Sequence, residues 1–444
     1  MSEFIERAKF ACALGGAIST LTALPKVVPI VHAAGGCAGY LSNTYSMAAG
    51  YKGSGFCGGS MLPTSNIAEQ NIVFGGEDRL AEQIEHTIFA LDGDLYVVIT
   101  GCQVEIIGDD SISVARRYRD RNVIGASTPG FLGNALRGYD SVLSSIVEDV
   151  VEPAGTRDPL TVNIFGAVPG QDVFYRGNLD EIKRLLGLIG IRANTFFATG
   201  ENVASIKSYG AAALNLVLSP AAGIAPAERF QEVHGTPWLQ TELPIGPSGS
   251  AVFLRQAGEA LGVDRITVEK AIRAEDAAYY SFFERIVDIY SDLDLQRYAI
   301  VVADSYYAHP LTRFLANDLG WIPYLTAIND IEEADAQAAY TERFRDISSE
   351  TKPLIVYERN AGRLLEIVRN SRPRNDNRKY YDALEPAYVV GSVIERGLAE
   401  KLGAGFLSVA FPVSNRVVLN RGYAGWTGGL ALVEDLLTGI VASR

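Results

Sequence analysis

The stretch DLYVVITGCQVEIIGDD, residues 94–110, decides the fold that this sequence predicts. Residues 95–100 are apolar, aromatic or β-branched without alternation, which is typical of a strand buried on both faces of a parallel sheet. A glycine and a cysteine follow, and Asp109 or Asp110 suits the N-cap of a following helix. This order of strand, glycine-containing loop and helix is typical of βαβ units. Cys102 is therefore expected at the carboxyl end of a parallel strand, where open α/β sheets bind ligands.

The same alternation of strand and helix continues along the chain. A helix is predicted where Leu80, Ile84 and Ile88 fall on one face, and others over residues 180–189 and 429–441. Strands alternating with helices of this length predict an α/β fold of three Rossmann-like domains with mainly parallel sheets. The other predicted strands are residues 27–31, 161–165, 195–198, 213–218, 298–303, 353–357, 387–390 and 406–410.

The grouping of these strands predicts the domain boundaries. The first domain is expected at residues 1–159 and the second at residues 160–244, where the Pro- and Gly-rich LPIGPSGS stretch interrupts regular structure. A helical connection, residues 245–296, leads to a third domain at residues 297–412. The tail, residues 413–444, is expected to pack back on the first domain.

The composition limits the classes of function. The chain has 444 residues, 48% of them hydrophobic and 20% charged, as in ordinary globular proteins. A net charge of −13 argues against a nucleic-acid partner, because such proteins need a basic surface to neutralise phosphates. No apolar run reaches the ~18–20 residues of a membrane span. Glu3 and Glu6 stand where a signal peptide has positive charge, so a cytoplasmic protein is expected.

The four cysteines are the residues most suggestive of chemistry. Cys12, Cys37, Cys57 and Cys102 all lie in the first quarter of the chain. Cys37 follows the first predicted strand in the loop HAAGGC, and Cys12 stands near the start of a helix, whose dipole favours a thiolate. Soft thiolates select iron–sulfur clusters, zinc or Cu(I), although the short spacings of zinc sites are absent. The alternative is that they are buried free thiols that act as small hydrophobes.

The sequence motifs around these cysteines resemble those of one known family. Over nearly its whole length, and in the same order, the sequence resembles component 1 of nitrogenases and nitrogenase-like reductases. The stretches that carry the resemblance are CALGGAISTLTALPKVVPIVHAAGGCAGY (12–40), SNIAEQNIVFGGEDRL (65–80), GCQVEIIGDD (101–110), STPGFLGN (127–134), LNLVLSP (214–220), TELPIGPSGSAVFLRQ (241–256) and FPVSNRVVLNRGYAGWTGG (411–429).

The resemblance implies a metal centre. In that family two homologous subunits each contribute three cysteines to an iron–sulfur cluster at their interface, and Cys12, Cys37 and Cys102 match those positions, whereas Cys57 matches none. The cluster is expected to be of the 8Fe-7S P-cluster type, with a 4Fe-4S cluster as the alternative. The backbone amides of Gly35, Gly36 and Gly101 are expected to support it by hydrogen bonds to sulfur.

The resemblance also implies which subunit this is. The alpha type binds the catalytic cofactor through a cysteine after a mid-chain strand and a histidine near the C-terminus. Here Ser219 stands at the cysteine position, and no histidine follows His309. The chain is therefore expected to be the beta type, an oxidoreductase subunit without catalytic residues, whose partner alpha subunit carries the cofactor. The four histidines are scattered without metal-ligand spacing and are expected to be structural.

The function implied is electron relay in an α2β2 heterotetramer. A homodimeric ATP-dependent iron–sulfur reductase would supply the electrons. Gly130 stands where molybdenum nitrogenase has a serine ligand in a Thr-Pro-Ser turn, and the long N-terminal extension of that beta subunit is absent. Both differences favour a nitrogenase-like reductase, and the overall likeness favours a methylthio-alkane reductase, which reduces C–S bonds, over dinitrogen fixation. The alternatives are a dinitrogen-reducing nitrogenase, a non-catalytic cofactor-assembly scaffold, and an α/β binding protein with incidental cysteines.

Overall fold

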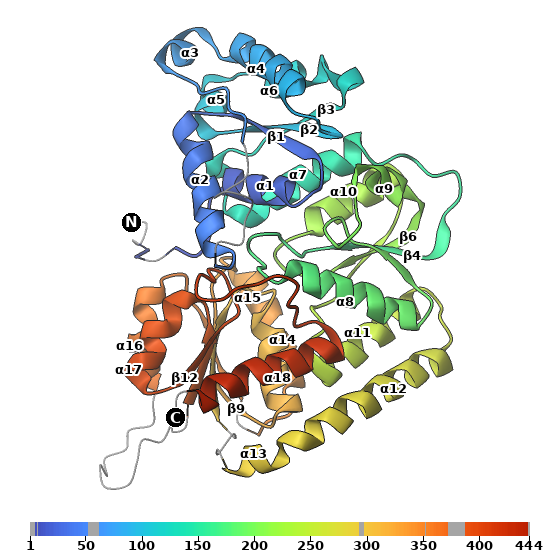
Figure 1. Cartoon of the computed structure of the whole chain (residues 1–444), viewed down its shortest axis with the longest axis vertical. Coiled ribbons are helices and arrows are strands. Elements are labelled where there is room, and N and C mark those ends of the chain that lie inside the picture. The colour runs from blue at the N-terminus through green and yellow to red at the C-terminus, as the bar shows by residue number, and fades with distance from the viewer. Residues whose placement is uncertain are drawn as a thin grey trace.

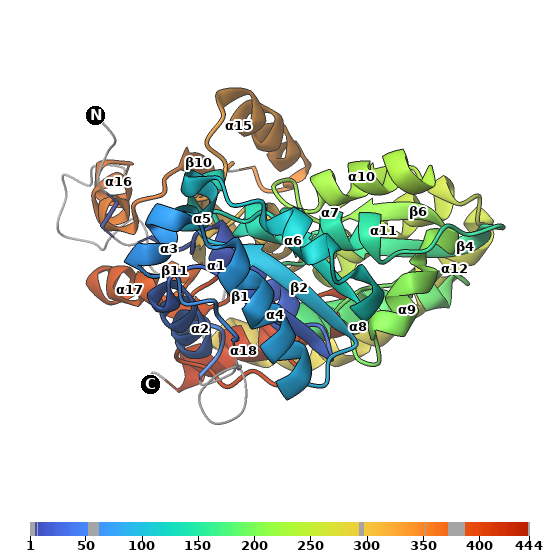
Figure 2. The ribbon, with the colours of Figure 1, turned by 90° about the horizontal axis from the view of Figure 1, so that it is seen from above.

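The strands form three parallel sheets, one after another along the chain (Figure 1). The computed structural model describes residues 5–6, 8–51, 62–292, 297–350, 352–371 and 387–442. Seen from above, the elements of the first sheet lie in front of the junction between the other two (Figure 2). None of the helices in the described ranges is long and apolar enough to cross a membrane.

The first sheet has the order β1-β2-β3, and all six residues of β2 are buried. Helices α1 and α7 cover one face, and α4 and α6 cover the other, where Leu80 and Ile84 pack against Ile30 and Val98. Burial on both faces explains why β2 lacks the alternation of a half-exposed strand. The elements are β1 (Val27–His32), β2 (Leu95–Thr100), β3 (Val123–Ala126), α1 (Ala13–Thr22), α2 (Gly35–Ala48), α3 (Glu69–Phe74), α4 (Glu77–Ala90), α5 (Cys102–Ile107), α6 (Ser111–Arg116) and α7 (Ala135–Asp149).

The second sheet has the order β5-β4-β6-β7. Its core joins that of the first, because α10 packs against α7 as well as against this sheet. The elements are β4 (Asp158–Phe165), β5 (Arg192–Asn194), β6 (Ala212–Val217), β7 (Trp238–Gln240), α8 (Tyr175–Leu188), α9 (Val203–Lys207), α10 (Ile224–His234) and α11 (Gly246–Ala260).

The third sheet has the order β10-β9-β8-β11-β12. Helices α16 and α17 form a separate core on one face, and α14 and α18 cover the other. The elements are β8 (Tyr298–Ala303), β9 (Ile322–Ile328), β10 (Leu354–Tyr357), β11 (Ala387–Gly391), β12 (Gly405–Ser408), α12 (Arg265–Phe283), α13 (Val287–Asp292), α14 (Ala308–Arg313), α15 (Ala334–Thr341), α16 (Leu364–Ser371), α17 (Arg396–Leu402) and α18 (Gly425–Val441).

One predicted strand is wrong. Residues 195–198 do not form a strand, and the sheet uses β5 just before them. The reason is Phe196, whose φ of 58° lies in the left-handed region and cannot continue a strand. Its ring is buried against those of Phe165 and Tyr209, and this packing holds the unusual backbone in place.

The C-terminal tail packs in part differently from the prediction made from the sequence. Residue Val413 exchanges backbone hydrogen bonds with the end of α2, at Ala48 and Gly50, so the start of the tail does meet the first part of the chain. Helix α18, however, begins at Gly425, four residues before the predicted start, and its main contacts are with α8, α11, α12 and β12. Gly429 allows this packing, because a Cβ there would lie 2.8 Å from the Gly246 Cα.

A buried ion network joins the second and third sheets. The His309 ring on α14 lies 3.0 Å from the Glu242 carboxylate, just after β7, and 2.8 Å from that of Asp346. Burial alone would lower the pKa of His309, but the hydrogen bonds to Asp346 and Glu242 outweigh it and raise the pKa. Burial would raise the pKa of Glu242, but His309, Arg313 and Arg343 together lower it to about 2.

We expect His309→Ala to destabilise the fold by about 3 kcal/mol, because it removes a buried imidazole and leaves the partly buried Glu242 carboxylate without that partner. The contribution of Glu242 to the free energy of unfolding is present above its usual pKa of 4.5 and is lost as pH falls toward about 2. The contribution of His309 to the free energy of unfolding is present below its usual pKa of 6.5 and is lost as pH rises through its raised pKa. Thermal melts from pH 3 to 9 should therefore show the largest difference between wild type and variant near pH 5–6. The exposed His86→Ala is the matched control, and equal melting temperatures for both variants would contradict this account.

Candidate metal centre

All three predicted cysteine ligands lie at the N-termini of helices. Cys12 is the N-cap residue of α1, Cys37 lies in the first turn of α2, and Cys102 is the first residue of α5. Each of the three is partly exposed and unbridged. The thiols are therefore placed to act as soft metal ligands.

The turn at Gly130 brings Cys12 and Cys102 together. The Gly130 amide donates a hydrogen bond to the Cys102 Sγ at 3.1 Å. A Cβ at Gly130 would lie 3.0 Å from the Cys102 Sγ and 3.5 Å from the Cys12 Sγ. Both sulfurs therefore face the same small space, which stays open because this residue has no side chain.

Cys37 approaches the residue that follows Cys102. The Gln103 side-chain amide is 4.0 Å from the Cys37 Sγ, and Gln103 follows Cys102 directly in the chain. No three His, Cys, Asp or Glu side chains among the described residues close around one metal ion. The three thiols thus form an open set, of the kind that a larger group shared with a second chain would complete.

The fold explains why residues so distant in sequence meet here. β1 and β2 are parallel neighbours in which His32 is paired with Thr100, so the loops that carry Cys37 and Cys102 leave the sheet side by side. Cys12 is held by a bridge to Asn134, which N-caps α7, and the Ala13 amide donates to the Gly133 carbonyl at 3.0 Å. The turn at residues 127–134 therefore joins the positions of Cys12 and Cys102, and the pairing of β1 with β2 brings the loop of Cys37 beside that of Cys102.

A carboxylate fixes this turn to the end of β2. The Glu105 side chain accepts hydrogen bonds from the hydroxyls of Thr100 at 2.5 Å and Ser127 at 2.6 Å. Asp110 caps α6 by accepting from the Ser113 amide at 3.0 Å, as the sequence predicted for one of the two aspartates. Both acidic side chains are therefore structural.

The predicted supporting amides have different environments. Gly101 donates its amide to the His32 carbonyl at 2.9 Å, so this amide holds β1 and β2 together instead of facing sulfur. Gly35 and Gly36 open α2, where backbone amides lack partners within the helix, and their role stays a prediction. Sequence reasoning missed the amide of Gly130, which does bond a cysteine sulfur. Cys57 lies outside the described residues.

Exposed apolar side chains lie near Cys37, Cys102 and Gly130 in the sequence. Ile106 on α5 is 73% exposed, Phe131 beside Gly130 is 65% exposed, and Tyr40 on α2 is 73% exposed. Each lies within four residues of Cys102, Gly130 or Cys37 along the chain. Clustered exposed apolar residues mark protein–protein contact surfaces. Exposed apolar residues of this kind beside the cysteine-bearing segments would suit contact with a partner chain.

The position of Ser219 does not resemble a metal site. Ser219 is buried, and its hydroxyl accepts from the Ala221 amide at 3.2 Å. The cavity that it lines with Asp172, Asp304 and Asp330 has a volume of about 10 Å³, enough for about one water molecule. Burial raises the pKa of all three carboxyl groups. An adjoining open cleft of about 580 Å³ is lined by neither cysteine nor histidine in the described chain.

Known proteins resemble this chain in sequence. A model of the family described as nitrogenase component 1 type oxidoreductase matches residues 12–441. The nitrogenase molybdenum-iron protein beta chain of Methanococcus maripaludis is 23% identical over 96% of this chain and 92% of its own length. One subunit of the light-independent protochlorophyllide reductase of Nostoc punctiforme is 25% identical over 58% of this chain and 49% of its own. The molybdenum-iron protein alpha chain of Methanosarcina barkeri is 26% identical over the same shares.

A solved structure has the same fold. The structure named "Nitrogenase Cp1 at pH 6.5" superposes with a TM-score of 0.78 at 20% identity. The match covers 99% of this chain and 95% of that chain. The predicted α/β fold is therefore confirmed over the whole length of the protein.

Proposed function

This chain belongs to the nitrogenase component 1 family of oxidoreductases, and on that premise we propose that it is the beta-type, electron-relaying subunit of a nitrogenase-like reductase. Cys12, Cys37 and Cys102 hold one half of an iron–sulfur cluster, and a homologous alpha subunit holds the other half. The catalytic cofactor belongs to the alpha subunit. The observation that supports the proposal is the approach of the Cys12 and Cys102 sulfurs at the Gly130 turn, with Cys37 near Gln103, the residue after Cys102.

The donor set fits a cluster of this kind. Three thiolates are soft ligands suited to iron–sulfur chemistry, and each cysteine stands at the start of a helix. When bound, such a cluster takes up and releases single electrons. The hydrogen bond from Gly130 to the Cys102 sulfur helps to set the potential at which it does so. Six thiolates from two chains favour the 8Fe-7S type over a 4Fe-4S cluster.

The partner surface supports a complex with the alpha subunit. The exposed apolar residues Ile106, Phe131 and Tyr40 lie on the segments that carry Cys102, Gly130 and Cys37, so a partner that completes the cluster would also cover them. Two such pairs form the α2β2 heterotetramer, and a homodimeric ATP-dependent iron–sulfur reductase docks on it to deliver electrons. The net charge of −13 allows electrostatic steering of that reductase.

The substrate class in this proposal is the volatile methylthio-alkanes. Support comes from the sequence, where Gly130 replaces the serine of the molybdenum enzyme. For dimethyl sulfide, two electrons and two protons break one C–S bond and give methane and methanethiol, with the new C–H and S–H bonds taking the protons. The residues that select the substrate belong to the alpha subunit.

The test is an assay of the anaerobically purified complex. With the reductase, ATP and dimethyl sulfide, we expect methane and methanethiol in equal amounts, and no product without ATP. Formation of ammonia from dinitrogen, without methane, would overturn the proposed substrate class but would leave the proposed role in electron relay intact. A brown complex that reduces neither compound, although the reductase hydrolyses ATP, would instead indicate an assembly scaffold.

A further inference from the structure

A buried chain of hydrogen bonds joins Ser65, His32 and Asp109 beside α5, the helix that begins at Cys102. The His32 Nδ1 lies 2.9 Å from the Ser65 hydroxyl, and the His32 Nε2 lies 3.2 Å from the Asp109 carboxylate. All three side chains are buried. The order of the groups is that of a serine hydrolase triad, but burial closes the hydroxyl to a substrate.

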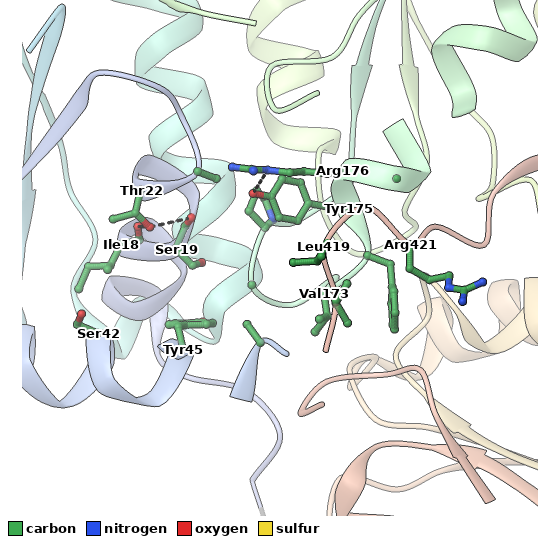
Figure 3. Close-up of a pocket in the computed structure, with 17 residues that line it drawn as sticks. Ile18, Ser19, Thr22, Ser42, Tyr45, Val173, Tyr175, Arg176, Leu419 and Arg421 are labelled. Carbon is green, nitrogen blue, oxygen red and sulfur yellow. Dashed lines mark hydrogen bonds between the residues drawn. The ribbon is translucent and has the colours of Figure 1, made fainter. Parts of the chain in front are cut away.

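The chain also lies apart from the open cavity between α1, α2 and the first turn of α8. Figure 3 shows this cavity, which has a volume of about 330 Å³. The residues that line it do not include Ser65, His32 or Asp109, all of which the structure describes. The three side chains therefore act on the protein itself.

The ring of His32 is neutral at pH 7 and has one proton to donate. Burial lowers the pKa of His32 below its usual value of 6.5, although the hydrogen bond to Asp109 opposes this effect. Because an ionised carboxylate can only accept, the proton lies on Nε2 and is donated to Asp109. Nδ1 then accepts from the Ser65 hydroxyl, which fixes the tautomer and the orientation of the ring.

Asp109 is also held by the start of α4. Its carboxylate oxygens accept from the amide of Gly76, the N-cap of α4, at 3.0 and 3.1 Å. A Cβ at Gly76 would lie 2.5 Å from the Asp109 Oδ2 and 3.1 Å from the His32 Cε1, so this close contact needs glycine. Asp109 is therefore fixed to β1 through His32 and to α4 through Gly76.

His32 reaches both ends of α5. Its carbonyl accepts from the amide of Gly101, the N-cap of α5, at 2.9 Å. Its ring holds Asp109 just after the helix, and the Asp109 amide donates back to the Val104 carbonyl within α5 at 3.0 Å. α5 has only six residues, and a helix this short is not stable by itself. Its orientation therefore depends on these anchors.

The anchors divide between the two ends of α5. The Glu105 carboxylate holds the first turn through two hydroxyls from neighbouring segments. The His32 ring holds the last turn through Asp109. Without the ring, α5 would be free to tilt about its first turn, and the tilt would redirect the Sγ of Cys102, its first residue.

We propose that His32 is a positioning residue for the iron–sulfur cluster of the proposed function. The ring acts through Asp109, by holding α5 in the orientation that brings the Cys102 Sγ to the Gly130 amide. This inference rests on the proposed function, because the direction of the sulfur matters to a cluster only if the sulfur is a ligand. Hydrogen bonds to its sulfurs help to set a cluster's potential, so a tilt of α5 shifts that potential.

The first test is hydrogen–deuterium exchange of the purified complex, read by mass spectrometry. His32→Leu has no donor or acceptor in its side chain, so we expect the α5 amides to exchange about ten-fold faster or more than in the wild type. His32→Gln places an amide N–H near the position of Nε2 and should restore most of the protection by donating to Asp109. Exchange over α7, on the other face of the first sheet, should stay unchanged.

The second test is a redox titration of the same complexes, followed by EPR. We expect His32→Leu to shift the midpoint potential and to change the EPR spectrum of the interface cluster, and His32→Gln to stay close to the wild type. His309→Ala is the matched control, because it also removes a buried, hydrogen-bonded imidazole, but between the second and third sheets. It should lower the melting temperature and leave the potential and the α5 exchange unchanged.

Ser65→Ala replaces His32→Leu in both tests where the leucine variant does not fold. It removes only the hydroxyl that fixes the tautomer of His32. The ring can then turn away from Asp109, so α5 should exchange a few-fold faster and the potential should again shift.

Three results would overturn the proposal. They are wild-type α5 exchange or an unchanged potential in the folded variant, a His32→Gln complex that behaves as His32→Leu, and an equal shift of potential in His309→Ala. Faster α5 exchange in complexes that hold no interface iron would instead overturn the proposed function and leave the anchoring of α5 in place. The exchange measurement needs neither iron nor turnover, so the two failures are distinct.

Discussion

Cys102→Ala should remove the shared cluster and with it all reductase-dependent turnover. The Cys102 sulfur accepts from the Gly130 amide beside Cys12, and the next residue, Gln103, lies 4.0 Å from the Cys37 sulfur. Alanine leaves no soft ligand at this position. We expect the iron bound at the interface to fall to background and electron transfer to drop by at least a thousand-fold. Iron analysis and EPR of the anaerobic complex measure the first effect.

Cys57→Ala is the matched control, because it makes the same substitution at a cysteine without an assigned ligand role. The resemblance assigns Cys57 no ligand role, so its variant should keep the iron content and turnover of the wild type. A complex that loses its iron with Cys57→Ala and keeps it with Cys102→Ala would reverse the ligand assignment. Retained folding of both variants is checked by their melting temperatures.

Gly130→Val should have the second largest effect. A Cβ at this position already approaches the Cys102 Sγ to 3.0 Å and the Cys12 Cβ to 3.3 Å, and valine adds two methyl groups to that space. The side chain then occupies the volume between the thiols, so the iron content should fall several-fold while all three cysteines remain. Rotation of the sulfurs away from the space would also lengthen the Gly130 hydrogen bond.

Gly187→Val provides the matched control for this steric argument. Gly187 is exposed near the end of α8, and a Cβ there meets no described atom within 4 Å. The control should keep its iron and its EPR spectrum. Full iron loading of Gly130→Val, with an unchanged spectrum, would show that the space beside Gly130 is not where the cluster lies.

The fold could be predicted from the sequence wherever strands are long and apolar. β2 and β8 coincide with their predicted ranges, because an unbroken run of buried side chains identifies a central parallel strand. The shorter or interrupted strands β3, β7 and β9 were missed. β7 has three residues and β9 contains Pro323, and their strand conformation depends on neighbours in the sheet.

The candidate site was predictable only in part, for a physical reason. Strand ends and helix starts place Cys37 and Cys102 at one edge of a sheet, which sequence patterns can indicate. The turn that brings Cys12 to them depends on a bridge between Cys12 and Asn134, a contact between residues far apart in the sequence. The role of Gly130 as a hydrogen-bond donor to sulfur follows from that turn. No local pattern encodes it.

Anomalous X-ray diffraction at the iron absorption edge, on crystals of the anaerobic complex with its alpha subunit, tests the central claim most directly. The account predicts iron between the two chains, within bonding distance of the sulfurs of Cys12, Cys37 and Cys102. A complex in which these three sulfurs contact no iron, with all the iron held by the partner chain, would contradict it.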